Sequence, residues 1–212
     1  MVQQTTERSN VYGLLATAYR DVPTIELLRQ IRDPAFLRAL NDVGVRFDES
    51  FLGSPEEPLL AKLSCEYTRL FLGPGKHISP HESVHTLADG EGLWGKSTIQ
   101  VQAFLESAGV EFRSGYHGLP DHISTELEFM QKITEAEAQA WKREACAEAM
   151  QWLAVEKEFV DQHLAQWVPG FCEKVIGDAE SSFYREIAQL TRDFVALEKQ
   201  EIERLGRRPL LQ

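Results

Sequence analysis

The sequence predicts an all-α fold: a single helical bundle over residues 1–212, with a long loop between its N-terminal and C-terminal halves. Apolar residues recur every three or four positions in nearly every segment, and cap residues, glycine or proline separate these segments. No run of β-branched residues is typical of a strand. With 212 residues and 43% hydrophobic content, the chain can bury the core that such a bundle requires.

Two helices are predicted early in the chain. The first covers residues 9–20, with one apolar stripe formed by Val11, Leu14, Leu15, Ala18 and Tyr19. The second begins at Asp33-Pro34, because aspartate is a common N-cap residue and proline fits the first helical position. Its apolar residues are Phe36, Leu37 and Leu40.

The clearest helix start is Ser54-Pro55-Glu56-Glu57. Serine at the N-cap, proline at the first helical position and glutamate at the third form a capping box. The apolar stripe that follows consists of Leu59, Leu60, Leu63, Tyr67, Leu70 and Phe71. Gly73-Pro74-Gly75 ends this helix, which we expect to be central to the core.

Residues 73–96 are rich in glycine, proline and histidine and are predicted to form the long loop. A helix follows, capped by Ser97 or Thr98 and ended by Gly109. From Pro120 onward almost every segment favours helix, and Asp121 is placed to cap the first of these helices or to lie in its first turn. Breaks are predicted near residues 134–140, at residues 167–170 and at Gly177-Asp178, and the last helix runs from Phe183 to Leu205.

The formal net charge of −11 argues against a nucleic-acid partner, which would require clustered cations, and suits a basic ligand or peptide. No stretch approaches the length of an apolar membrane span, and the polar N-terminus has no apolar leader region. The three cysteines are widely separated, as expected of reduced thiols. These observations predict a cytoplasmic protein with no stable membrane insertion.

Two motifs suggest other chemistry. GEGLWGKS, residues 90–97, fits the phosphate-binding pattern G-x-x-x-x-G-K-[ST], but the strand that must precede such a loop is missing from the sequence. His77, His81 and His85 have the spacing of ligands on one helix face, but Pro80 lies among them and favours exposed loop histidines over a metal site.

The segment GLPDHISTELEFM, residues 118–130, places Asp121, His122 and Glu126 at the start of a helix. These side chains could form only a cap and a solvated face. Alternatively, an aspartate beside a histidine, close to a long loop, could bind a cationic or hydrogen-bonding ligand. The pattern alone leaves both interpretations open.

Four blocks occur in the order and at about the spacing seen in the TorD/DmsD/NarJ-like cytoplasmic chaperones of molybdoenzymes, which this chain resembles over most of its length. They are EYTRLFLGPG (66–75), SPHES (79–83), GLPDHISTELEFM (118–130) and FVDQHLAQWVPGF (159–171). The resemblance implies an all-helical protein that is not an enzyme. It further implies binding of the twin-arginine signal peptide and the body of a redox enzyme precursor, with export delayed until a molybdopterin cofactor is inserted.

The resemblance also implies which residues line the peptide groove. They are Tyr67, Leu70 and Phe71 from the Y-x-x-L-F helix, Pro80, Glu82 and Ser83 from the P-x-E-S loop, and Asp121, His122 and Glu126 from the third block. Glu82 and Asp121 would supply carboxylates to the arginine pair. Relatives often have an aromatic residue at the position of His81, which bears on which precursor is accepted.

Several alternatives remain beside the chaperone. The chain could instead be a small helical enzyme dependent on a nucleotide or a metal, built on His122 with Asp121 or on the loop histidines. No resident cofactor is predicted, although the resemblance allows weak binding of a guanine nucleotide. The protein could be a monomer or a domain-swapped dimer, because hinge loops of this kind permit exchange.

Overall fold

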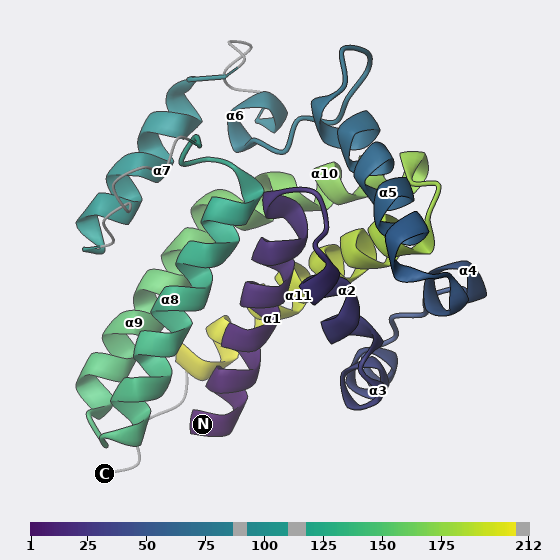
Figure 1. Cartoon of the computed structure of the whole chain (residues 1–212). Helices are drawn as coiled ribbons and strands as arrows, with labels where there is room; N and C mark the ends of the chain where they lie inside the picture. The colour runs from purple at the N-terminus through teal and green to yellow at the C-terminus, as the bar shows by residue number, and fades with distance from the viewer. Residues whose placement is uncertain (87–92, 110–117, 207–212) are drawn as a thin grey trace.

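The computed structural model describes residues 1–86, 93–109 and 118–206, which form helices and connecting loops with no strand among them (Figure 1). The elements are, in chain order, α1 (Val2–Arg20), α2 (Ile25–Arg32), α3 (Pro34–Asp42), α4 (Glu49–Gly53), α5 (Glu56–Tyr67), the π-helical turn η1 (Thr68–Leu72), α6 (Glu82–His85), α7 (Lys96–Ser107), α8 (Ile123–Lys142), α9 (Cys146–Phe159), the π-helical turn η2 (Val160–Leu164), α10 (Ala165–Asp178) and α11 (Ser182–Gly206). The predicted all-α class is confirmed.

The long helices form the body of the bundle. Helix α1 packs along α8, α8 along α9, and α10 along α11 (Figure 1). Helices α2 to α5 lie on the right in this view, and α7 lies at the upper left, beyond α6. The short helix α6 packs against both α7 and α10, so it connects the outlying α7 to the main bundle.

The Y-x-x-L-F stripe lies in the core, as the sequence predicts for this central helix. The ring of Phe71 is 5.1 Å from that of Tyr67, 5.9 Å from that of Tyr184 and 6.1 Å from that of Phe171, measured between centroids. The Tyr67 hydroxyl donates to the Tyr19 carbonyl at 3.0 Å, which satisfies its polar atom. This aromatic cluster joins the end of α5 and η1 to α1, α10 and α11.

A buried charge cluster joins α1 to α8, α9 and α11. The Arg8 guanidinium is buried and contacts carboxylates from three other helices: Glu137 at 3.0 Å, Glu198 at 2.9 Å, and Glu156. Tyr12 also donates to Glu198 at 2.9 Å. Because these groups lie out of water, the arrangement is stable only while the Arg8 charge and the carboxyl groups around it remain paired.

The structure confirms the predicted cap at Asp33 and corrects the predicted caps of α5 and α7. The Asp33 side chain accepts from the backbone N–H groups of Ala35 and Phe36, with Pro34 at the first helical position. Pro55, not Ser54, is the N-cap of α5, and the Ser54 carbonyl accepts from Arg32 instead. Helix α7 likewise starts earlier than predicted, at Lys96.

Two predicted breaks are wrong, because buried side chains keep the helix intact. Helix α8 continues through residues 134–140, where the Thr134 hydroxyl donates to the Met130 carbonyl at 2.7 Å inside the helix. Helix α10 contains Pro169, flanked by the fully buried Val168 and Phe171. Packing of this kind overrides intrinsic preference. The predicted end at Gly177-Asp178 and the long last helix are confirmed.

The first helix also begins earlier than predicted, at Val2, because Thr5, Arg8 and Ser9 pack inward. The predicted long loop contains the one-turn helix α6, and its residues 87–92 lie outside the described part of the chain.

Within the described ranges, no helix has the length and apolar character needed to span a bilayer. All three cysteines are free.

We expect Arg8→Met to destabilise the fold by about 3–5 kcal/mol, because it leaves three buried carboxylates without their cation. The matched control is Arg20→Met. Arg20 pairs with Glu128 at 2.7 Å on the surface, so its loss should cost less than about 1 kcal/mol. Urea unfolding of both variants measures the difference, and equal losses would contradict the assigned role of the buried cluster.

Candidate functional site

Two of the sequence blocks meet in space. The Glu82 N–H donates to the Asp121 carbonyl at 2.9 Å, and the Ile123 N–H donates to the Pro80 carbonyl at 2.9 Å. Between these bonds, His81 and His122 form an isolated antiparallel bridge. The P-x-E-S loop therefore lies directly against the start of α8, and residues 38 or more positions apart in sequence form one site.

The acidic side chains of these blocks point inward. Glu82 is 3% exposed, and Asp121 and Glu126 are fully buried. Asp121 accepts from the Ser83 N–H at 3.1 Å, while Glu82 contacts Nδ1 of His163 at 3.0 Å. These contacts attach α6 to α8 and η2, so the carboxylates hold the loop in place.

Glu126 is fully buried beside Glu82 and Asp121. Its Oε2 accepts from the Trp167 indole N–H at 3.1 Å. Burial, and then the neighbouring charge of Glu82, raise the pKa of the Glu126 carboxyl well above its usual value. Burial therefore favours the protonated, uncharged form of this carboxyl, which lessens the charge in this dry region.

The helix cap is His122 rather than Asp121, which corrects the predicted cap. Nδ1 of His122 accepts from the Ser124 N–H at 3.1 Å. Burial, and then the neighbouring His81, lower the pKa of His122 to about 3. The His81 ring lies edge-on to it at 4.9 Å, and burial lowers its pKa as well. Both rings are therefore neutral at pH 7.

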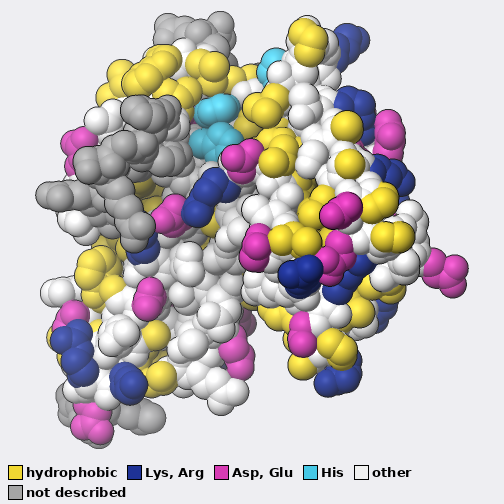
Figure 2. Space-filling model, in the orientation of Figure 1, with side chains coloured by type: hydrophobic (Ala, Val, Ile, Leu, Met, Phe, Trp, Pro, Cys, Tyr) yellow, Lys and Arg dark blue, Asp and Glu magenta, His cyan; other side chains and the backbone are white. Residues whose placement is uncertain are grey.

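The structure separates the predicted groove residues into two groups by exposure. Eight of the ten are buried: Tyr67, Leu70, Phe71, Pro80, Glu82, Ser83, Asp121 and Glu126. His81 and His122 are partly exposed, and Figure 2 shows histidine side chains at the surface with hydrophobic groups on both sides. The expected carboxylates, Glu82 and Asp121, do not reach solvent, because each is engaged inside the protein.

The loop histidines do not share a helix face. His77 is exposed, whereas His85 stacks on Trp167 at 5.4 Å and its Nε2 contacts the Ser79 carbonyl at 2.7 Å. Within the described residues, no group of three or more histidine, cysteine, aspartate or glutamate side chains could hold a metal ion.

The phosphate-loop motif is described only from Leu93, because Gly90 to Gly92 lie outside the described residues. Among the described residues, the element before the motif is the helix α6, where a phosphate-binding loop would require a strand. Lys96 and Ser97 form the first turn of α7, and Ser97 is buried with its hydroxyl 2.9 Å from that of Thr86.

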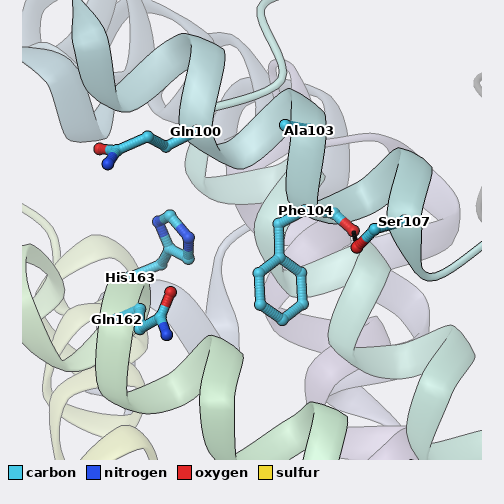
Figure 3. A pocket seen from close by; sticks show the side chains of 6 residues that line it. All are labelled: Gln100, Ala103, Phe104, Ser107, Gln162 and His163. Carbon is cyan, nitrogen blue, oxygen red and sulfur yellow. Dashed lines mark hydrogen bonds between the residues drawn. The ribbon is translucent and has the colours of Figure 1, made fainter.

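A pocket that the sequence did not predict lies between α7 and η2 (Figure 3). Its volume is about 560 Å³, and it is lined by Gln100, Ala103, Phe104, Ser107, Gln162 and His163. Four of these residues follow helical spacing along one face of α7, which is the signal that could have identified it. Gln162 and His163 stand in the FVDQHLAQWVPGF block but were not assigned a role.

Exposed apolar side chains cover α6 and the start of α7. Val84, Leu93, Trp94 and Ile99 are 44–68% exposed, and hydrophobic groups gather at the upper left of Figure 2, where Figure 1 draws these helices. Trp94 has a φ of 69°, a left-handed conformation that large side chains rarely adopt. We call these four residues the apolar patch.

Comparisons with known proteins agree on one family. The family model described as "Nitrate reductase delta subunit" matches residues 33–173. The chain is 26% identical over 145 residues to the "Chaperone protein TorD" of Vibrio cholerae serotype O1, covering 68% of this chain and 64% of that relative. It is 23% identical over 201 residues to the protein of the same name from Shewanella loihica, covering 92% and 79%.

A solved structure supports the fold. The crystal structure of a protein of Archaeoglobus fulgidus, described as a redox enzyme maturation protein, superposes with a TM-score of 0.52 at 18% identity. The match covers 89% of this chain and 93% of that one. The match to the Vibrio cholerae relatives spans slightly less than two thirds of their own length.

The lowered pKa of His122 predicts a pH-dependent stability. The unfolded chain binds a proton near pH 6.5 that the folded chain binds only near pH 3, so stability is complete above pH 6.5 and falls as the pH is lowered. When the pH is lowered from 7 to 5, the unfolding free energy of the wild type should fall by about 1–2 kcal/mol more than that of His122→Asn. Asparagine keeps a cap acceptor but does not titrate.

Urea unfolding at the two pH values measures this difference. The matched control is His77→Asn on the exposed loop, which should follow the wild type. If His122→Asn and the wild type lose the same stability on acidification, His122 does not contribute the expected proton uptake.

Proposed function

Because the chain belongs to the nitrate reductase delta subunit family, we propose that it is a chaperone that assists the maturation of a molybdenum-containing redox enzyme and performs no catalysis of its own. It binds the twin-arginine signal peptide and the body of the precursor in the cytoplasm. Export is delayed until the molybdopterin cofactor has been inserted. The family match over residues 33–173 is the observation that carries this proposal.

The surface chemistry supports a peptide of this kind. A twin-arginine signal joins two guanidinium groups to an apolar stretch, so its receptor requires negative charge beside exposed apolar side chains. The chain has a net charge of −11 and carries the apolar patch on α6 and α7. The apolar stretch of the signal lies on this patch, and exposed carboxylates attract the arginine pair.

The buried motif residues have an indirect role in this binding. Glu82 and Asp121 fix the loop that carries His81 and Val84, so they position the surface without contacting the peptide. The neutral rings of His81 and His122 remain at the surface, where their nitrogens can hydrogen-bond to the peptide backbone.

Calorimetric titration with a synthetic twin-arginine signal peptide tests the function. We expect saturable binding that weakens when both arginines are replaced by glutamine and when salt is raised, because the attraction is partly electrostatic. A wild-type chain that binds no such peptide would overturn the proposal.

The same titration locates the binding surface. Trp94→Ala should weaken binding roughly tenfold, because exposed tryptophans often dominate interfaces. The control is Leu197→Ala, which removes a 52% exposed apolar side chain from α11. Equal affinities for the two variants would place the peptide elsewhere on the chain.

A further inference from the structure

The pocket between α7 and η2 has walls of different chemistry. Phe104 projects from α7 into the gap, and its ring is held by Phe159 at 5.1 Å and by Phe129 at 6.0 Å (Figure 3). Ala103 beside it is too small to fill the space. The result is a rigid apolar wall next to an open volume of about 560 Å³.

Two amide side chains line this volume. Gln100 extends from α7 and Gln162 from η2, on opposite walls of the pocket (Figure 3). The Gln100 carboxamide offers both a donor and an acceptor, the pair of groups that a peptide backbone presents, while Gln162 donates through Nε2 to Glu158 at 3.0 Å and offers its carbonyl oxygen as an acceptor. The two walls can therefore pair with an extended chain lying between them.

His163 supplies a third polar group. It is only 4% exposed, and its Nδ1 is 3.0 Å from the Glu82 carboxylate. This partner fixes Nδ1 as a donor, which leaves Nε2 for a second hydrogen bond. Among the described residues Nε2 has no hydrogen-bond partner, and the ring lines the pocket.

The π-helical turn is a second sign that this region is a site. Residues 160–164 form η2 between the regular helices α9 and α10, and this turn places Gln162 and His163 together at the pocket. π-Helical turns are rare and are frequently found at functional sites.

We propose that this pocket binds one apolar side chain of the signal peptide, seated on Phe104, with the adjoining backbone paired to Gln100, Gln162 and Nε2 of His163. This inference rests on the proposed function. Among the described residues, the lining carries no lysine, arginine, aspartate or glutamate, so this part of the pocket matches neither the arginine pair nor a phosphate group. Its volume of about 560 Å³ lies in the range of ligand-binding pockets and leaves room for a leucine or phenylalanine side chain together with the adjoining backbone.

Ala103→Trp tests the pocket by filling it. Ala103 is exposed on α7, so the variant should fold normally, which its thermal unfolding verifies. We expect it to bind the signal peptide at least about tenfold more weakly than the wild type in calorimetry. The matched control is Gln102→Trp, which puts the same side chain on α7 outside the pocket and should change the affinity less than about twofold.

A second measurement uses the wild-type chain and a signal peptide carrying photoreactive leucine at each apolar position in turn. We expect crosslinks to residues 100–107 or 162–163. Equal binding by the two tryptophan variants, or crosslinks confined to other residues, would overturn the pocket assignment while leaving the chaperone function intact. Failure of the wild type to bind any signal peptide would instead overturn the proposed function.

Discussion

The need to pair buried charges determines how this bundle is connected. At one end, Arg8 joins α1 to carboxylates on α8, α9 and α11. At the other, Glu82 joins the short helix α6 to His163 on η2, while the buried Asp121 and Glu126 lie beside this pair. A charge left alone in either place would cost several kcal/mol, so the loop is fixed relative to the long helices. The partly exposed histidines and the pocket depend on that fixed position.

The sequence predicted those features that depend on local signals. Asp33-Pro34 and the long apolar stripe of α11 were correct because cap chemistry and periodicity act within a few residues. Ser54 was wrong because Arg32, from another helix, binds its carbonyl, and the break at Pro169 was wrong because the surrounding side chains are buried. Such contacts between distant segments have no local signature in a single sequence.

In the candidate site, too, the sequence predicted some features and missed those set by contacts between distant segments. The resemblance selected blocks that do meet in space, since His81 and His122 are bridged. It did not indicate that Glu82, Asp121 and Glu126 point inward, because an acidic residue in a loop motif is ordinarily exposed. The pocket was missed for a related reason: Gln100 and Gln162 are unremarkable surface residues until the fold places α7 beside η2.

The π-helical turn η2 also explains how α9, which precedes it, and α10, which follows it, make different contacts with the same helix, α8. One extra residue in a helical turn rotates all the following residues by about 100° around the helix axis. Before the turn, Phe159 meets Phe129 of α8 at 4.7 Å, and after it, Trp167 donates to Glu126 of the same helix at 3.1 Å. The angular offset places an apolar contact and a polar contact one after the other along the same side of α8.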